Sequence, residues 1–134
     1  MLLATMVVIA ASVAVPTSAT AALDVSGTWW SVDREGVEQT MTIERTSNVD
    51  QYRVHATSAK SSVCGGMEAN ASGLGYMPRE SSEMTVEYRV NCMMESVAVC
   101  SFAAKTAYNF DPERSSLRDQ FDVTWRRISE PVNG

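Results

Sequence analysis

The chain has 134 residues, of which 45% are hydrophobic, and its formal net charge is −5 with a single histidine. This length suits one domain with one hydrophobic core. The acidic balance argues against nucleic acid or an anionic membrane surface as a partner, because both attract basic patches.

The chain begins with an apolar segment that has no charged side chain, Met1–Ala21. Ala19 and Ala21 supply the small residues that signal peptidase accepts before its cleavage site. The apolar run is shorter than the roughly 20 residues that a membrane-spanning helix needs. We therefore expect residues 1–21 to be a cleaved signal peptide and residues 22–134 to form one domain. The mature protein would be secreted, periplasmic or extracellular, with no membrane span.

Beyond this leader, hydrophobic and polar residues alternate in short runs that are separated by turn residues. In the clearest run, residues 83–92, Met84, Val86 and Tyr88 lie on one face and Thr85 and Glu87 on the other. A period of two is typical of strands with one buried and one exposed face. In chain order, the pattern predicts strands at 25–33, 37–45, 50–58, 62–69, 71–77, 83–92, 97–110 and 117–128.

The predicted strands are joined by short connections, which favour antiparallel up-and-down order. Turn residues occupy these connections, as in Asp33–Gly36 and Asp111–Ser116. Closing the sheet into a barrel would remove both exposed edges. We therefore predict an all-β fold, a small antiparallel up-and-down β-barrel of about 7–8 strands, with an open β-sandwich as the alternative.

The two ends of this domain resemble the calycin barrels, which are the lipocalins and their relatives. The opening strand contains Gly27-Thr28-Trp29, and the closing strand ends in Trp125-Arg126-Arg127. The resemblance implies that Trp29 plugs the base of the barrel and that Gly27 allows close backbone approach. It also implies that Arg126 or Arg127 lies across the ring of Trp29.

The whole pattern, with Cys64-Gly65-Gly66 in the middle and a late Asp111-Pro112 turn, also resembles small secreted bacterial β-proteins. That second resemblance implies a compartment and a type of fold, and no activity.

Three cysteines, Cys64, Cys92 and Cys100, lie in a chain bound for an oxidising space, so we expect one disulfide and one free thiol. A four-residue hairpin loop at 93–96 would leave Cys92 and Cys100 out of register and too far apart for a bond. We therefore favour a Cys64–Cys92 disulfide, with Gly65-Gly66 giving the backbone room, and a buried free thiol at Cys100.

No spacing of residues in the chain indicates catalysis. The only histidine, His55, is predicted on the exposed face of its strand, and a nucleophile with a base is not evident. The pairs Asp119 with Asp122, and Asp33 with Glu35, belong to turns and strand exteriors, where solvated carboxylates are ordinary. We expect no enzyme activity, no catalytic residues, no cofactor and no metal.

The predicted function is that of a secreted binding protein that holds a small apolar ligand in a calycin-like barrel. Aromatic walls are common in such pockets, and we expect Tyr88, Phe102 and Tyr108 to line this one. The alternative is a protein with a filled core, an interaction protein or inhibitor whose surface loops bind a protein partner. Both hypotheses predict the same alternation, and under both we expect a monomer.

Overall fold

The computed structural model describes residues 23–129, so the predicted signal peptide, residues 1–21, lies outside the described residues. The described chain forms eight strands and one short 3-10 helix, η1. Their bounds are β1 Gly27–Val32, β2 Glu38–Arg45, β3 Gln51–Ser61, η1 Ser62–Cys64, β4 Met67–Tyr76, β5 Glu83–Met94, β6 Val97–Asp111, β7 Ser116–Asp119 and β8 Thr124–Ser129. Across these residues, there is no helix long and apolar enough to cross a membrane.

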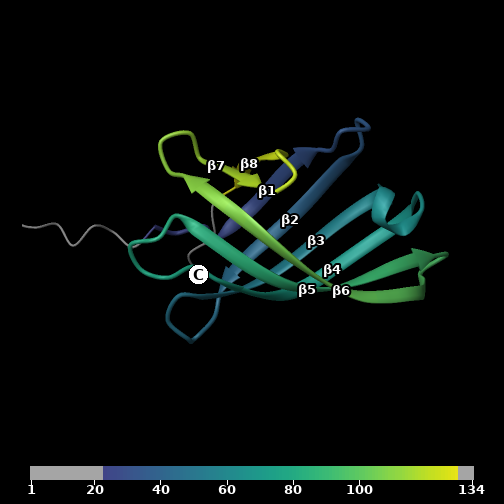
Figure 1. The fold of residues 1–134 in the computed structure, drawn as a ribbon, viewed down its shortest axis with the longest axis horizontal. Coiled ribbons are helices and arrows are strands. Elements are labelled where there is room, and N and C mark those ends of the chain that lie inside the picture. The colour runs from purple at the N-terminus through teal and green to yellow at the C-terminus, as the bar shows by residue number, and fades with distance from the viewer. Residues whose placement is uncertain (1–22, 130–134) are drawn as a thin grey trace, which may run out of the picture.

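The eight strands form a closed antiparallel barrel in which each strand pairs with the next and β8 pairs with β1 (Figure 1). This arrangement confirms the predicted all-β, up-and-down barrel, and the open sandwich is not the fold. The first and last strands meet where Trp29 is the partner of Arg127. Barrel closure therefore joins the two segments whose motifs resemble the calycin barrels.

Two of the predicted strand boundaries were wrong. Residues 62–69 and 71–77 do not form two strands, because η1 and a turn at Gly65 and Gly66 precede a single strand, β4. Both glycines have positive φ, 64° and 90°, which lets the chain reverse there. The predicted last strand, 117–128, is divided into β7 and β8 by a turn at residues 120–123.

The core is made by the inward-facing side chains of all eight strands. Each of these residues has an exposed fraction of 8% or less, and the larger ones are Trp29, Met41, Ile43, Tyr52, Val54, Met84, Val86, Tyr88, Val90, Tyr108, Phe110, Leu117 and Trp125, with Met77 joining them just after β4. The alternation predicted over 83–92 is present, because Met84, Val86, Tyr88, Val90 and Cys92 are all buried. Gly27 opens β1 with φ 136°, a conformation that side chains other than glycine rarely adopt.

The barrel wall is much longer on one side than on the other. β5 and β6 have 12 and 15 residues, whereas β7 and β8 have 4 and 6. In Figure 1, the β3–β4 and β5–β6 hairpins extend beyond the short β7–β8 pair. One end of the barrel is therefore enclosed by eight strands, and the other continues as a curved sheet made mainly of β3 to β6.

Candidate functional site

The enclosed end of the barrel is filled by Trp29, whose side chain is fully buried. Its indole N–H donates a hydrogen bond to the carbonyl oxygen of Val25 at 2.9 Å. The guanidinium carbon of Arg127 lies 4.8 Å from the centroid of the Trp29 ring and 5.5 Å from that of Phe110. Arg126 is exposed, so Arg127 is the arginine that lies across the tryptophan.

The middle of the barrel holds two buried tyrosines from neighbouring strands, Tyr88 and Tyr108, whose hydroxyl oxygens are 2.6 Å apart. The Tyr88 hydroxyl also lies 3.5 Å from the Met41 sulfur, which can accept a hydrogen bond from it, and either tyrosine hydroxyl can donate to the other. Burial raises the pKa of Tyr88, and it raises the pKa of Tyr108 well above its usual value. Both phenols therefore stay neutral, and they satisfy each other inside the barrel.

Next to the tyrosine pair, toward the long end of the sheet, lies a set of inward-facing residues that we call the open end: Ala56, Ala71, Val90, Phe102 and Ala104. The strand register joins them, because Val90 is the partner of both Ala71 and Phe102, and Ala71 is the partner of Ala56. Phe102 is only half-buried, and it packs against the core with the three alanines. The members of this set on β3 and β4, Ala56 and Ala71, have small side chains.

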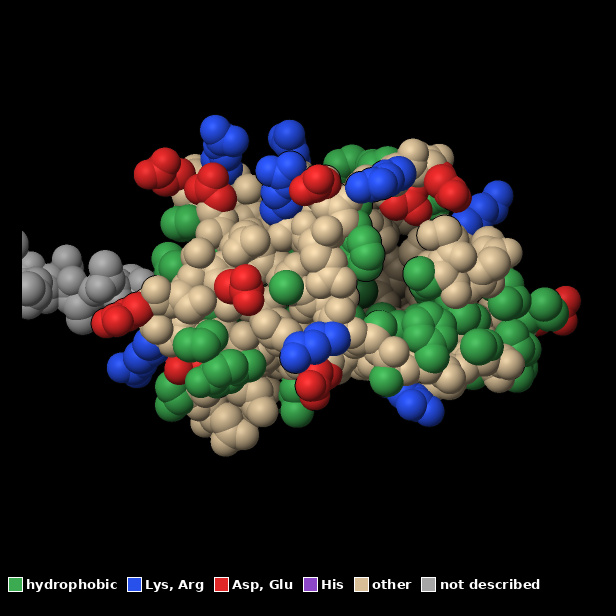
Figure 2. Space-filling view, viewed as in Figure 1, with side chains coloured by type: hydrophobic (Ala, Val, Ile, Leu, Met, Phe, Trp, Pro, Cys, Tyr) green, Lys and Arg blue, Asp and Glu red, His purple; other side chains and the backbone are tan. Residues whose placement is uncertain are grey.

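The wall next to the open end is incomplete. Among the described residues, β6 pairs along its second edge only where Tyr108–Asp111 meets β7. The side chain of Gln120 continues this edge by one step, since its oxygen accepts from the Ala107 N–H at 3.1 Å and its amide donates to the Lys105 carbonyl at 3.3 Å. Figure 2 shows the molecule hollowed on one face, with hydrophobic side chains at the margin of the hollow and along the right-hand part of that face.

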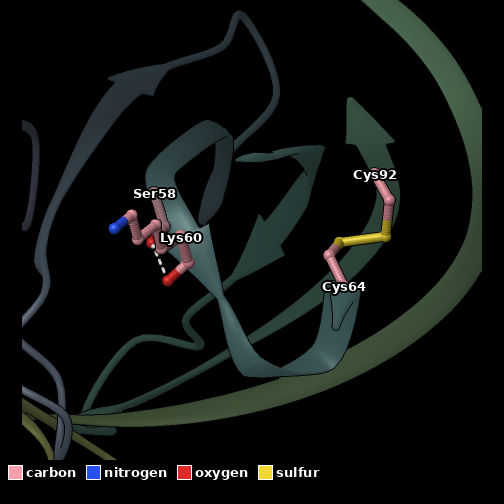
Figure 3. Close-up of a disulfide and its surroundings, with 4 residues drawn as sticks. All are labelled: Ser58, Lys60, Cys64 and Cys92. Carbon is pink, nitrogen blue, oxygen red and sulfur yellow. Dashed lines mark hydrogen bonds between the residues drawn. A yellow bond between two sulfur atoms is a disulfide. The ribbon is translucent and has the colours of Figure 1, made fainter. Parts of the chain in front are cut away.

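A disulfide lies at the far end of the long sheet and connects Cys64 at the end of η1 to Cys92 on β5 (Figure 3). Its S–S distance is 2.02 Å and its Cα–Cα distance is 5.3 Å, which confirms the predicted pairing. Because Cys92 continues the inward face of Tyr88 and Val90, Cys64 and η1 are held on the inner side of the sheet.

Two expectations about Cys100 were wrong. The thiol is exposed rather than buried, and Cys100 is the direct partner of Cys92 in the register of β5 and β6. The predicted four-residue loop at 93–96 is a two-residue turn, Glu95-Ser96, with φ 50° and 68°. A bulge near Met93 then shifts the register by one residue and brings the two cysteines opposite each other.

Sequence reasoning did not find a second concave surface, which lies on the outside of β6, β7 and β8. It is a groove of about 680 Å³, lined by Asn109, Phe110, Asp111, Arg114, Ser116, Arg118, Thr124 and Arg126. Two of its arginines are paired at the surface, Arg114 with Asp111 at 3.7 Å and Arg118 with Asp122 at 3.2 Å. The alternation in 116–118 and 124–126 could have placed Arg118 and Arg126 on one outer face.

The acidic residues considered for acid–base chemistry have structural partners. Asp119 accepts hydrogen bonds from the N–H groups of Phe121 and Val123 and from the Trp125 indole, so it holds the β7–β8 turn. Asp33 accepts from the N–H groups of its own turn, at Glu35 and Val37. Within residues 23–129, no group of three or more His, Cys, Asp and Glu side chains is placed to hold a metal ion.

The structure thus brings together two of the three predicted ligand contacts, Tyr88 and Tyr108, in the filled middle of the barrel, and places Phe102 at the open end. Comparison with known proteins gives no match to this chain, whether with protein-family models, curated proteins or solved structures. The class of protein that the fold defines is therefore that of a small, closed antiparallel β-barrel.

Proposed function

We propose that this protein is a secreted binding module that takes a small apolar ligand at the open end of its barrel. The observation that carries the proposal is the half-buried ring of Phe102, which shares the inner face of the sheet with Ala56 and Ala71 beside an incomplete wall. Apolar and aromatic surfaces in a hollow are what such ligands bind. Phe102 contacts the ligand directly, and the Tyr88–Tyr108 pair forms the floor beneath it.

The rest of the assignment follows from the barrel and the disulfide. The Cys64–Cys92 bond fits an oxidising compartment outside the cytoplasm. The calycin-like character rests on Arg127 across Trp29 at the enclosed end. In this proposal the ligand enters from the opposite end, where β6 extends past its pairing with β7.

A fluorescent fatty acid, a dansyl-labelled undecanoic acid, is a suitable probe for this site. We expect its emission to rise with the mature protein and the rise to saturate. Phe102→Ser should weaken binding about tenfold, the loss of about 1.4 kcal/mol that a partly buried aromatic contact provides.

Leu74→Ser is the matched control, because Leu74 is 51% exposed and points to the outside of β4. It removes a similar apolar surface from the opposite face and should leave the probe affinity unchanged. Equal losses in Phe102→Ser and Leu74→Ser, or no saturable binding at all, would contradict the proposed site.

A second candidate function is that of a protein that binds a partner through the tip of the β5–β6 hairpin. The observation that favours it is the exposure there of Met94, Val97 and Val99, which are 55%, 62% and 52% exposed. Neighbouring exposed apolar side chains mark many protein interaction surfaces. Val97→Ser with Val99→Ser should abolish binding to such a partner while leaving the affinity for the dansyl probe intact.

A further inference from the structure

We propose that Cys100 exchanges with the Cys64–Cys92 disulfide, forming a Cys92–Cys100 bond and releasing Cys64 together with η1. The protein would then have two disulfide isomers, one with η1 tethered to β5 and one with η1 free. Cys100 would be the attacking thiol of a built-in switch.

The strand register supplies the geometry for this exchange. Cys92 and Cys100 are opposed partners on β5 and β6, so their side chains leave the sheet on the same face. The Cα atoms of opposed residues in antiparallel strands are about 4.5–5.5 Å apart. A disulfide spans Cα distances of about 4.4–6.8 Å, a range that includes this separation.

The three cysteines also differ in accessibility in the way that exchange requires. Cys64 and Cys92 are 4% and 1% exposed, whereas the Cys100 side chain is exposed to solvent. The thiolate is the attacking species in thiol–disulfide exchange. An external thiol has poor access to the buried sulfurs, while Cys100 is already beside Cys92.

The step is balanced within the chain. The Cys100 thiolate attacks the Cys92 sulfur, the Cys64–Cys92 bond breaks, and its electron pair leaves with the Cys64 sulfur, which takes up a proton. One disulfide and one thiol are present before and after, so no oxidant or reductant takes part.

The consequence of exchange is a change at the end of the long sheet. The disulfide holds η1 on the inner side of the long sheet, and Cys64 is its covalent attachment to β5. Release of Cys64 frees η1 at the end of the sheet beyond Phe102. The effect on ligand binding that we expect from this release rests on the proposed function of the open end. Loop-closure entropy acts on the unfolded chain and sets no ratio between two folded isomers. The structure holds the Cys64–Cys92 bond, so the exchanged form is the minor state.

The exchange can be measured by mapping the free thiol. The mature protein is held at about pH 8.5 without redox reagents, acidified, unfolded, and alkylated with N-ethylmaleimide, and the labelled peptides are quantified by mass spectrometry. We expect one label per molecule throughout, most of it at Cys100 and a minor fraction at Cys64. Label found only at Cys100, or a second population at Cys92 instead of Cys64, would overturn the proposal.

The control moves the thiol by one residue. Cys100→Ser combined with Ser101→Cys keeps an exposed thiol on β6 but turns it to the opposite face of the sheet. This variant should carry its label at position 101 and none at Cys64. Equal labelling of Cys64 in the variant and in the natural protein would show that opposition to Cys92 is not the cause, and so would overturn the proposal.

Binding of the dansyl probe separates this inference from the proposed function. Cys64→Ser, oxidised with glutathione disulfide, represents the exchanged isomer, and Cys100→Ser represents the locked native one. We expect at least a threefold difference in probe affinity between them, with circular dichroism confirming that both are folded. Binding without any label at Cys64 in the natural protein would overturn the exchange alone, and labelled Cys64 without probe binding would overturn the proposed function alone.

Discussion

The guanidinium of Arg127 lies across the indole ring of Trp29, and these two residues are opposed partners in the pairing of β8 with β1. The same guanidinium also faces the ring of Phe110, which meets Trp29 edge to face with centroids 6.1 Å apart. One side chain from the last strand therefore stabilises an aromatic pair formed by the first and sixth strands. The contact lies at the pairing that closes the barrel.

Replacing Arg127 should destabilise the barrel more than replacing its neighbour. Arg127→Met removes a cation–π contact worth about 0.5–2 kcal/mol and a hydrogen bond to the Asp24 carbonyl, so we expect a loss of about 1–3 kcal/mol in the free energy of unfolding. Arg126→Met, at an exposed position, should change it by less than about 0.5 kcal/mol. Urea unfolding measures both, and equal losses would contradict the role of Arg127.

The tyrosine hydroxyls should behave as a coupled pair. Tyr88→Phe leaves the hydroxyl of Tyr108, a residue that is 3% exposed, without its hydrogen-bond partner, and we expect a cost of about 1–3 kcal/mol. The double variant with Tyr108→Phe removes both polar groups and should cost less than the sum of the two single variants, by about 0.5 kcal/mol or more. Strict additivity in a double-mutant cycle would show that the pair contributes no coupling.

The same pair predicts a loss of stability in alkali. Burial raises the pKa of Tyr88 and of Tyr108 above the ordinary tyrosine value of 10.0, so the folded state holds both protons more tightly than the unfolded state. Their contribution is complete below the unfolded pKa and is lost as the pH rises from there toward the folded values. Urea unfolding at increasing pH above about 10 should show a steeper decline in the natural protein than in the double Phe variant. Parallel profiles would rule out the tyrosines as the cause.

Gly73 should tolerate no side chain. A Cβ atom at this position would overlap the carbonyl oxygen of Glu87 in the neighbouring strand, which is backbone and cannot turn away. We expect Gly73→Ala to lower the free energy of unfolding by about 3 kcal/mol. Ser72→Ala, at the preceding residue and on the opposite face of β4, is the control. It should change the thermal unfolding temperature only slightly.

Gln120 should protect the unpaired part of β6. Gln120→Ala removes the acceptor of the Ala107 amide, so hydrogen exchange at Ala107 should be faster by about tenfold, as expected for the loss of a bond worth about 1 kcal/mol or slightly more. The amide of Phe110, which bonds to the Ser82 carbonyl on the other edge of β6, provides the reference and should keep its exchange rate. Unchanged exchange at Ala107 would indicate that the amide is protected by other means.

Much of the barrel could be predicted because its strands bury alternate residues. Met84, Val86 and Tyr88 were identified as a buried face, since large apolar residues alternate there with Thr85 and Glu87. The β4 strand gave a weaker pattern, because its inward positions are small residues such as Ala71 and Gly73 that alternation does not distinguish. The result was two predicted strands where one exists.

The turns were harder to predict, for reasons that concern single residues. Phe121 continues the alternation of Val123 and Trp125 in the sequence, yet it is 57% exposed in a turn that the Asp119 carboxylate holds. Glu95 and Ser96 adopt positive φ without a glycine to signal it. That shorter turn is why the position of Cys100 opposite Cys92 could not be derived from the spacing of the cysteines.

The choice between Arg126 and Arg127 could have been made from the sequence. Arg127 continues the alternation of Val123 and Trp125, whereas Arg126 lies on the opposite, exposed face. The open end could not be foreseen, because it depends on how far β6 extends past its pairing with β7, a difference in strand length between distant segments.

The antiparallel pairing of β1 with β8 has a consequence for engineering. Thr28 near the start of the domain is opposite Ser129 near its end, so the two ends of the folded unit lie side by side. Every other pairing joins consecutive strands through a short turn. The domain is therefore suited to circular permutation, with a short linker across the β1–β8 ends and new termini in the exposed connection at Glu113 and Arg114. It could equally be inserted as a cassette into a surface loop of another protein, with entry and exit at adjacent points.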